Sequence, residues 1–583
     1  MSLLAVSSLC IGYGGTEVVS NVSFGVDAGE SVGLVGESGS GKTQTALAIM
    51  GLLPEKAAVS GSIVFDGREI VGARERQLDR LRAARIGMVF QDPAQALNPY
   101  VPIGKQLRRV LLSHGTSGGR DVDQRVMHML DRVGLPDPAR QFRAYPHQLS
   151  GGMRQRVMIA SALIAGPDLL IADEPTTALD VTVQAQILDL LERIREETAL
   201  LLITHDLGII AGHCERLLVI DDGRLVEEGP TRKLFSEPAS PHTRRLIDAA
   251  PRLDGPLPQA PDAGDIVLDA DDVSVSYTER EGRKQLHAVQ DLDLELRAGE
   301  TVAVVGESGS GKSSFVRAVL GLVPMRAGRV TFCGQELAGP VKARAVQMRR
   351  DLQLVFQDPA GSLDPQLRIE QVIAEPLTVH AADLDASGRR ERVTAALQRV
   401  GLDNSLLRRF PHQLSGGQAQ RVAIARALIV NPKVLVCDEA VAALDGSVRQ
   451  QILDLLRREQ EATGLAIVFI SHDLAVVRSI SHRVMVLYLG RLVELANVAD
   501  IFRRPRHPYT RALLDAVPVP DPVAPGGKLS VRGEVPSILT PPRGCAFHPR
   551  CRHVRSRCRV ELPRGRSIGS TQVACHFAEE LDL

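Results

Sequence analysis

The stretch GESGSGKT at Gly36–Thr43 decides the fold of this chain, and GESGSGKS repeats it at Gly306–Ser313. Both match the phosphate-binding pattern G-x-x-x-x-G-K-[ST]. Glycines at these positions allow backbone N–H groups to converge on phosphate oxygens, and the helix that follows points its positive dipole end at them. The sequence therefore predicts two phosphate-binding loops, each between a strand and a helix.

Other motifs also occur twice, at a nearly constant separation. The phosphate loop, VFQDPA, PHQLSGG, DEPTTALD/DEAVAALD and THD/SHD recur after 270, 266, 265, 265 and 267 residues. Such an offset indicates two homologous domains in tandem that differ by short loop insertions. We predict a first domain at 1–250, a Pro-rich linker at 251–265, a second domain at 266–517 and a Pro-, Arg- and Cys-rich tail at 518–583.

Length and composition exclude several classes of protein. The 583 residues, 44% hydrophobic and 24% charged, are too many for one core and too apolar for a disordered chain. Lys+Arg and Asp+Glu both total 69 and tryptophan is absent, so we predict no nucleic-acid partner. No apolar run approaches 18 residues and the N-terminus shows no signal peptide, which predicts a cytoplasmic chain.

The segments around the motifs predict an α/β fold. Ser31–Val35 leads into the first phosphate loop as a strand, and Thr43–Met50 follows the loop as a helix. Leu169–Ala172 and Leu200–Ile203 are short apolar runs typical of buried parallel strands. They place the acidic motif and the THD motif at the carboxyl ends of strands, where ligands bind in α/β sheets.

Residues suited to phosphoryl transfer follow these strands. Lys42 would reach the β- and γ-phosphates of a nucleotide, and the Thr43 hydroxyl would ligate Mg²⁺. Asp173 would hold the metal and Glu174 would polarise the attacking water. DEAVAALD keeps both acids but replaces the Pro-Thr pair of DEPTTALD, so both sites are expected to hydrolyse, with equal rates left open. The counterparts in the second domain are Lys312, Ser313, Asp438 and Glu439.

A further motif lies between each phosphate loop and its acidic strand: LSGGMRQR at Leu149–Arg156 and LSGGQAQR at Leu414–Arg421. With this signature the sequence resembles the ATP-binding cassette (ABC) ATPases over roughly 1–250 and 266–517. The resemblance implies a helical subdomain between VFQDPA and the signature. It also implies that the two cassettes of this chain pair head to tail, holding two ATP molecules between the phosphate loop of one and the signature of the other.

The resemblance implies further site residues, matched motif by motif. A glutamine in VFQDPA would sense the γ-phosphate and Mg²⁺, a histidine in THD or SHD would hold water and glutamate in line, and a tyrosine would stack on adenine. The first ATP site would comprise Tyr13, Gly36, Ser38, Gly39, Gly41, Lys42, Thr43, Gln91, Asp173, Glu174 and His205, closed by Ser415 and Gly417. The second would comprise Tyr277, Gly306, Ser308, Gly309, Gly311, Lys312, Ser313, Gln357, Asp438, Glu439 and His472, closed by Ser150 and Gly152. The catalytic residues would be Glu174, His205, Glu439 and His472, and the Mg²⁺ ligands Thr43, Gln91 and Asp173 in one site and Ser313, Gln357 and Asp438 in the other.

Additional stretches are similar to one branch of this family. FQDPAQALNP, FQDPAGSLDP, HPYTRALL and PSILTPPRGCAFHPRC resemble the ATP-binding subunits of dipeptide, oligopeptide and nickel importers, which usually keep their two ATPases on separate chains. The resemblance implies an ATPase that powers peptide import through two separate transmembrane permease subunits, supplied by an extracytoplasmic solute-binding protein. The permeases would hold it, as a peripheral protein, at the cytoplasmic face of the plasma (inner) membrane.

Two alternatives remain open. The cargo of such an importer is not read by its ATPase, so nickel, glutathione or another small solute is an alternative to peptides. A twin-cassette ATPase that acts on ribosomes or DNA shares the tandem plan. The Pro-rich linker differs from the long charged helix of translation factors of this type, and the cysteine cluster follows the second cassette, whereas in the ribosome-recycling factor it precedes the first.

The tail contains four cysteines, Cys545, Cys551, Cys558 and Cys575, spaced C-x5-C-x6-C-x16-C. Four thiolates suit a [4Fe–4S] cluster or a tetrahedral Zn²⁺, and the spacing does not choose between them. Eight nearby arginines would offset the negative charge of such a site. The resemblance to peptide-importer ATPases implies the [4Fe–4S] cluster, whereas zinc and free thiols remain alternatives. Substitute ligands would be His548, His553 and His576.

Overall fold

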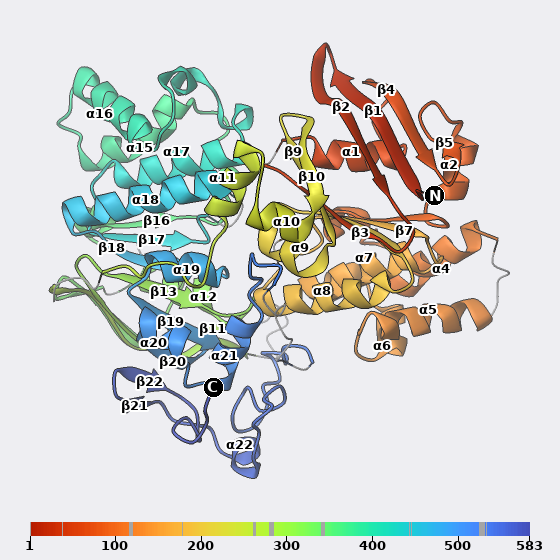
Figure 1. The fold of residues 1–583 in the computed structure, drawn as a ribbon. Helices are drawn as coiled ribbons and strands as arrows, with labels where there is room; N and C mark the ends of the chain where they lie inside the picture. Colours follow the sequence, from red (N-terminus) through yellow and green to blue (C-terminus); the bar gives the residue numbers. More distant parts are fainter. Residues whose placement is uncertain are drawn as a thin grey trace. The chain divides into compact units, whose positions relative to one another are not determined.

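A computed structural model of the chain describes residues 2–37, 39–115, 120–177, 179–259, 264–278, 285–337, 339, 344–441, 444, 446–523, 531 and 533–583. They form two compact units (Figure 1). The first unit consists mainly of residues up to Ala250, and the second mainly of residues from Pro251 to Val517 together with most of the tail. Each unit contains one of the two phosphate loops.

A six-stranded sheet carries the phosphate loop of the first unit. Its strands lie in the order β10-β9-β3-β8-β7-β6, and all neighbours are parallel except the antiparallel pair β9 and β10. Every residue of β3, β6, β7 and β8 is buried, as is typical of parallel strands covered on both faces. The strands are β3 (Ser31–Val35), β6 (Ile86–Val89), β7 (Leu169–Asp173), β8 (Ala199–Ile203), β9 (Arg216–Asp221) and β10 (Arg224–Pro230).

The side chains of alternate residues in these strands pack in two different hydrophobic cores. Leu169 and Ile171 of β7 pack with an antiparallel sheet and the helix α1 (Lys42–Ile49). Leu170 and Ala172 of the same strand pack with residues of the helical subdomain and of the helices that follow β7 and β8. This alternation is the two-residue period of a strand that is buried on both faces. The antiparallel sheet has the order β2-β1-β4-β5, with β1 (Leu4–Tyr13), β2 (Thr16–Val26), β4 (Ala57–Phe65) and β5 (Arg68–Glu69).

Helices fill the chain between β6 and β7, where a helical subdomain was expected. They are α3 (Pro93–Ala96), α4 (Ile103–Ser113), α5 (Arg120–Arg132), α6 (Pro138–Arg143), the 3-10 turn η1 (Pro146–Gln148) and the signature helix α7 (Gly151–Leu163). The other helices of the first unit are α2 (Glu75–Leu81), α8 (Val181–Arg195), α9 (Leu207–His213), α10 (Thr231–Ser236) and α11 (Pro241–Ala249).

The second unit repeats this plan. Its antiparallel sheet is β12-β11-β14-β15, with β11 (Ile266–Thr278), β12 (Gln285–Arg297), β14 (Ala327–Phe332) and β15 (Gln335–Glu336). The main sheet contains β13 (Thr301–Val305), β16 (Leu352–Val355), β17 (Val434–Asp438), β18 (Ala466–Ile470), β19 (Arg483–Tyr488) and β20 (Arg491–Asn497). The helices are α12 (Lys312–Val319), α13 (Val346–Asp351), α14 (Pro359–Ser362), α15 (Ile369–His380), α16 (Ala386–Arg399), η3 (Asn404–Arg408), η4 (Pro411–Gln413), α17 (Gly416–Leu428), α18 (Gly446–Thr463), α19 (Leu474–Ile480), α20 (Val498–Arg503) and α21 (Pro508–Asp515).

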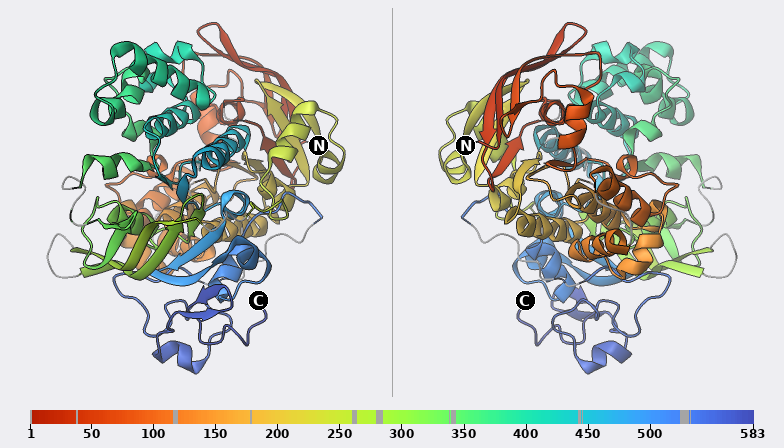
Figure 2. Two further views of the ribbon diagram at one scale, coloured as in Figure 1. Left: turned by 90° about the vertical axis from the view of Figure 1, so that its left-hand side faces the viewer. Right: turned by 90° about the vertical axis from the view of Figure 1, so that its right-hand side faces the viewer.

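The tail extends the main sheet of the second unit. It forms α22 (Ser556–Val560), β21 (Arg566–Ile568) and β22 (Thr571–Val573), and β22 pairs with β20 to give an eight-stranded sheet, β16-β17-β18-β13-β19-β20-β22-β21. Within this unit the tail lies at the end opposite α15 and α16 in all views (Figures 1 and 2). In the described part of the first unit, β10 is the last strand of its sheet.

The predicted elements agree with these boundaries to within one residue. The helix expected at Thr43–Met50 is α1, one residue earlier at each end, and the expected strand Leu169–Ala172 extends to Asp173. The described linker residues 251–259 form neither helix nor strand, as their Pro-rich composition favours. Within the described ranges, no helix combines the length and apolarity needed to cross a membrane.

Candidate functional site

Each phosphate loop is wrapped around the ammonium group of its own lysine. Lys42 is 6% exposed, and its Nζ donates to the carbonyl oxygens of Gly36 and Glu37 at 2.8 Å each. Lys312 makes the same two bonds at 2.7 and 3.0 Å, to Gly306 and Glu307. The sequence motif thus forms a closed cradle around a buried positive charge.

Glycines are required where the loop turns into its helix. Gly41 has a φ of 97° and Gly311 a φ of 100°, in the left-handed region that side chains disfavour. A Cβ at Gly36 would lie 2.2 Å from the Ile220 carbonyl oxygen, and one at Gly306 would lie 2.3 Å from that of Leu487. Only a chain without side chains at these points follows this path. Gly39 and Gly309 have φ values of 83° and 77°, whereas Ser38, also predicted in the site, lies outside the described residues.

The first acid of each pair is buried at the end of its strand. Asp173 is 2% exposed; burial raises the pKa of this carboxyl group to about 6, and a hydrogen bond with Thr43 opposes the rise. Burial likewise raises the pKa of Asp438, against a hydrogen bond that Ser313 Oγ donates to Asp438 Oδ1 at 3.1 Å. The loop hydroxyl and the strand-end aspartate, each predicted as a Mg²⁺ ligand, are therefore hydrogen-bonded neighbours in both units.

The second acid, Glu174, is held by three side chains. Gln91 Nε2 and Thr177 Oγ1 each donate to Glu174 Oε2 at 2.9 Å, and His205 Nδ1 lies 3.2 Å from Glu174 Oε1. Its backbone φ is 46°, unusual for a residue with a side chain. Strained backbone of this kind is found where the surrounding structure fixes a functional group. The structure brings the predicted Gln91, Glu174 and His205 together and adds Thr177, which the sequence analysis did not select.

Electrostatics separates the two neighbouring acids. Burial alone would raise the pKa of Glu174, but hydrogen bonding and charge interaction with His205, with smaller contributions from Thr177 and Lys42, lower it to about 2. Asp173 is thus pushed towards protonation while Glu174 stays ionised. Adjacent carboxyl groups with opposite pKa shifts are typical of sites where the two take different chemical roles.

The second unit repeats this network with fewer contacts. Gln357 Nε2 donates to Glu439 Oε2 at 2.7 Å, and His472 Nδ1 lies 3.7 Å from Glu439 Oε1. Hydrogen bonding and charge interaction with His472 lower the pKa of Glu439 against the effect of burial. Residue 442, the counterpart of Thr177, is an alanine outside the described residues, so the sequence supplies no hydroxyl group at that position.

The turn after the second acid also differs between the units. In the first, Gln155 Nε2 of the signature helix donates to the Pro175 carbonyl oxygen at 2.6 Å. The equivalent buried Gln420 Nε2 has no hydrogen-bond partner among the described residues of the second unit.

Each signature serine caps the helix that follows it. Ser150 Oγ accepts from Met153 N, and Ser415 Oγ accepts from Gln418 N. The predicted Gly152 packs inward, because a Cβ there would lie 2.6 Å from Val183 Cγ1, and Gly417 has side chains at van der Waals distance.

The preceding glycines, Gly151 and Gly416, are exposed with open space above them. They are the ones that leave the helix N-terminus accessible to an anion. Neither glycine was predicted from the sequence. Each is the first residue of its helix, so a prediction of the helix boundary could have found it.

The predicted tyrosines lie beside the helices that follow the loops. Tyr13 Oη donates to Gln44 Oε1, and Tyr277 Oη donates to Ser314 Oγ at 3.2 Å. In each case the partner is two residues after the loop lysine. Tyr277 is 38% exposed and Tyr13 is half-buried, so each leaves part of its ring free next to the loop.

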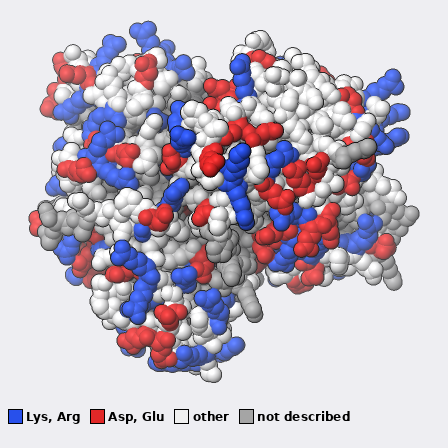
Figure 3. All heavy atoms as spheres, in the orientation of Figure 1, with Lys and Arg blue, Asp and Glu red and all other residues white. Residues whose placement is uncertain are grey.

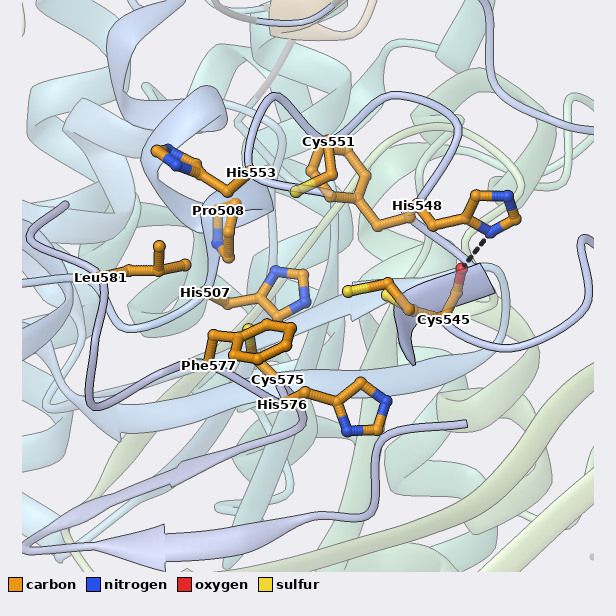
Figure 4. A pocket seen from close by; sticks show the side chains of 12 residues that line it. His507, Pro508, Cys545, His548, Cys551, His553, Cys575, His576, Phe577 and Leu581 are labelled. Atoms are coloured by element: carbon orange, nitrogen blue, oxygen red, sulfur yellow. Dashed lines mark hydrogen bonds between the residues drawn. The ribbon is translucent and has the colours of Figure 1, made fainter. Parts of the chain in front are cut away.

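The four tail cysteines line one small pocket with a volume of about 20 Å³, room for about one water molecule (Figure 4). Burial raises the pKa of Cys545 to about 12 and that of Cys551 to about 11, and also raises the pKa of Cys575. We call this the cysteine pocket. In the part of the chain that the structure describes, no three His, Cys, Asp or Glu side chains are arranged as they would be around a bound metal ion.

The three histidines considered as substitute ligands are engaged elsewhere. His548 turns outward, where its Nδ1 lies 3.0 Å from the Cys545 carbonyl oxygen (Figure 4). His576 Nε2 lies 2.9 Å from the Glu561 carbonyl oxygen, and His553 Nε2 accepts from Arg552 Nε. These three histidines and His507 nevertheless line the pocket beside the four thiols.

Comparison with known proteins agrees with these features. The family model described as ABC transporter matches residues 19–177 and 289–442. The model described as oligopeptide/dipeptide transporter, C-terminal region, matches 226–274 and 493–558.

Full-length relatives match as well. The glutathione import ATP-binding protein GsiA of Pectobacterium atrosepticum is 44% identical over 545 residues, 87% of each chain. The peptidoglycan transport ATP-binding protein YejF of Agrobacterium fabrum is 44% identical over 527 residues, 88% of this chain and 96% of that one. GsiA of Escherichia coli is 42% identical over 566 residues, 89% and 90%.

Two α/β cassettes, each with a buried loop lysine, strand-end acids and a signature helix, define an ATPase of the ABC class. The chain belongs to the ABC transporter family, and its C-terminal regions match those of oligopeptide and dipeptide transporters. The predictions of a tandem cassette fold, of ATPase activity and of a fused ATP-binding subunit of the peptide-importer group are confirmed.

The burial of Asp173 predicts a pH-dependent effect on stability. Its folded pKa, about 6, lies above the ordinary value of 3.8 for an aspartate, so ionisation opposes folding above pH 6 and this penalty disappears as the pH falls below 3.8. Two pKa units correspond to roughly 3 kcal/mol. In nucleotide-free protein with a chelator, Asp173→Asn should raise the melting temperature of the first unit at pH 7.5, and the gain should shrink towards pH 4.

Calorimetry at a series of pH values measures this effect. The control is Asp168→Asn, at the start of the same strand segment, where the carboxylate is 44% exposed and pairs with Arg85. That change should give no gain at any pH. A gain from Asp173→Asn that is equal at pH 4 and pH 7.5 would contradict the interpretation.

Proposed function

We propose that this chain is the ATP-hydrolysing subunit that powers the import of di- or oligopeptides through separate membrane permease subunits. The observation that carries the proposal is the doubled constellation of loop lysine, strand-end acids, glutamine and histidine, on a chain whose C-terminal regions match oligopeptide/dipeptide transporters. The relatives are named for glutathione and peptidoglycan. We therefore infer a di- or oligopeptide cargo, with nickel, glutathione or another small solute as the alternative.

The chain's residues divide the work of hydrolysis in each cassette. The loop amides and Lys42 would hold the β- and γ-phosphates of ATP. Glu174, ionised and fixed by Gln91 and His205, would orient the attacking water and accept its proton. Adenine would stack on the free part of Tyr13. The same roles in the second cassette fall to Lys312, Glu439, Gln357, His472 and Tyr277.

The residues at the strand end suit Mg²⁺. Asp173 Oδ1 is buried and has no hydrogen-bond partner among the described residues, and the Thr43 hydroxyl is its neighbour. Hydroxyl, carboxylate and amide oxygens are the ligands that Mg²⁺ prefers, so Thr43, Asp173 and Gln91 would hold it, with Ser313, Asp438 and Gln357 in the second cassette. The ion would neutralise charge that develops on the phosphates.

We infer that each site is completed by the signature of the other cassette. Ser150 and Gly151 in α7, and Ser415 and Gly416 in α17, are exposed at helix N-termini. Such termini attract anions. Gly152 and Gly417, selected from the sequence, would support these turns by close packing. Binding of two ATP molecules would close the cassette pair, and hydrolysis would release it, a two-state change driven by ligand.

Partners follow from the same proposal. Two permease subunits would receive the motion near the loops of Gln91 and Gln357, and an extracytoplasmic solute-binding protein would deliver cargo. The chain would lie peripherally at the cytoplasmic face of the membrane. On the face drawn in Figure 3, Lys and Arg alternate with Asp and Glu over the described residues, which supports the inference of no nucleic-acid partner.

The import function can be tested in membrane vesicles that contain the chain with its permeases. The vesicles are oriented so that the cassettes face the lumen. ATP enclosed in the lumen should then drive uptake of a labelled dipeptide that is added outside together with the binding protein. Uptake of nickel or free glutathione in place of the dipeptide would support the proposed ATPase role but show that the cargo is different. Association with ribosomes instead of permeases during purification would contradict the proposal.

Glu174→Gln should reduce ATP turnover about a hundredfold or more, while ATP binding is preserved, because the amide keeps the shape but cannot accept the proton. Glu439→Gln should cause a smaller loss, since that site lacks the Thr177 and Gln155 contacts of the first. Steady-state hydrolysis and ATP binding of the assembled complex measure both effects. Glu196→Gln, at an exposed position of the neighbouring segment, is the control. Near-normal turnover of Glu174→Gln would exclude the role.

We further propose that Cys545, Cys551, Cys558 and Cys575 bind a [4Fe–4S] cluster, with Zn²⁺ as the alternative. Support comes from the donor set, since four thiols line one pocket and one ring nitrogen of each of His548, His553 and His576 is hydrogen-bonded elsewhere. Four thiolates are the usual ligands of such a cluster. The small pocket would have to widen to hold the cluster, and the four thiols would have to turn towards it. A bound metal would brace a tail segment with little apolar core of its own.

Anaerobically purified protein should therefore be brown and contain about four iron atoms per chain. Cys551→Ser should remove the colour and the iron, whereas Cys333→Ser, at an exposed position far along the chain, should keep both. Elemental analysis and visible absorption measure the outcome. Stoichiometric zinc without iron would replace the cluster by the alternative, and absence of both metals would overturn the metal site.

A further inference from the structure

A buried ion pair joins the tail to the phosphate loop of the second cassette. Arg550 lies in the tail between Cys545 and Cys551, and Glu307 is the second residue of the loop. Their side chains are 2% and 1% exposed, and the guanidinium donates to both carboxylate oxygens, at 2.7 and 2.9 Å. A bidentate arginine–carboxylate pair of this geometry fixes orientation as well as distance.

The same loop residue is held a second time through its backbone. Glu307 N donates to the hydroxyl oxygen of Tyr509, a fully buried side chain of α21. The carbonyl oxygen of Glu307 accepts from Lys312 Nζ. One residue therefore connects Arg550 and Tyr509 on one side with the phosphate-binding lysine on the other.

The contact continues from the loop to the cysteine pocket. Phe547, in the tail, packs against Tyr488 and Tyr509 with ring centroids 5.3 Å away in each case. Phe547 and His507 also line the cysteine pocket. The Arg550 guanidinium lies over the Tyr488 ring at 6.0 Å and donates to its hydroxyl at 3.5 Å. Phe547 and Tyr509 thus connect the cysteine pocket with the phosphate loop.

The first cassette has no counterpart of this arrangement in its sequence. At the positions of Tyr488 and Tyr509, 267 residues earlier, stand Asp221 and His242. His242 Nδ1 lies 3.0 Å from Asp221 Oδ2. Glu37, at the position of Glu307, is half-buried rather than fully buried. The second cassette alone carries the aromatic residues that the tail contacts.

We propose that Arg550 is a positioning residue for the second ATP site: by binding Glu307, the tail holds the second phosphate loop in the shape that accepts ATP. The inference rests on the proposed function, in which the loop at Lys312 binds ATP. It assigns to the tail a direct effect on one of the two sites and none on the other.

The physical reason is the cost of an unpaired buried charge. Without Arg550 the Glu307 carboxylate, still buried and hydrogen-bonded by the Thr182 hydroxyl group, is left without a compensating positive charge, which is strongly unfavourable. The side chain then turns towards water and moves its own backbone, whose carbonyl oxygen holds Lys312 Nζ. ATP binding must restore the displaced loop, so its affinity falls while the acids that perform hydrolysis stay in place.

The experiment measures ATP affinity one site at a time in the full chain. Lys42→Ala leaves the second loop as the binding site, and Lys312→Ala leaves the first. Equilibrium binding of labelled ATP is measured in each background, with and without Arg550→Met. Methionine has a side chain of similar length to arginine but carries no charge. In the Lys42→Ala background the dissociation constant should rise about tenfold. In the Lys312→Ala background it should not change.

Two further variants separate positioning from a general loss of structure. Arg550→Lys keeps the charge but not the two parallel bonds, and should give an intermediate dissociation constant. Glu307→Gln combined with Arg550→Met removes both charges, and should bind ATP more tightly than Arg550→Met alone, because no charge is left unpaired. The control within the tail is Arg557→Met, since Arg557 is 55% exposed and pairs with Glu561. It should leave both sites unchanged.

The outcomes separate the inference from the function on which it rests. If the Lys42→Ala chain with native Arg550 binds no ATP, the proposed second ATP site is wrong. If that chain binds ATP equally well with and without Arg550, the positioning role is wrong and the site stands. An equal loss in both backgrounds would also overturn the inference, since it would show general destabilisation.

Discussion

The buried ammonium group of the loop lysine is the interaction on which the rest of each cassette depends. A positive charge that is 6 or 7% exposed must be compensated inside the protein. Two loop carbonyl groups provide part of that compensation, which requires the tight glycine path of the loop. The acids at the end of the adjoining strand interact with the same charge. The parallel sheet, with every residue of its central strands buried, holds these groups at one edge.

Much of this arrangement could be predicted from the sequence because it is local. A strand, a glycine loop and a helix follow one another within twenty residues, and the motifs recur at a constant offset, so their positions agreed with the structure to within one residue. Thr177 was missed because a threonine in a turn has no distinctive pattern. Arg550 was missed because its partner lies 243 residues away, and nothing in a single sequence links two such positions.

The two cassettes differ where the tail contacts the second one. Glu227 and Glu494 occupy equivalent positions in the two units. Each accepts hydrogen bonds from two backbone N–H groups, which directly precede α11 in the first unit and α21 in the second. Burial alone would raise the pKa of Glu227, but a hydrogen bond with Thr243 and these two backbone bonds lower it. In Glu494, which pairs with β22 of the tail, burial prevails and the pKa is raised. The same local fold therefore has a different electrostatic environment in each unit, since among the described strands β20 pairs with the tail strand β22 whereas β10 is the last strand of its sheet.

The nature of the tail contact has a further consequence. Apolar side chains such as Phe547 supply most of the favourable burial but pack in several ways with similar free energy. A buried bidentate ion pair tolerates only one geometry, since any shift leaves two charges without partners. The pair of Arg550 and Glu307 thus adds little net stability over an apolar contact of equal size. It selects the single register in which the tail, the aromatic layer and the phosphate loop fit together, and a selective contact of this kind is what allows a distant segment to act on one loop.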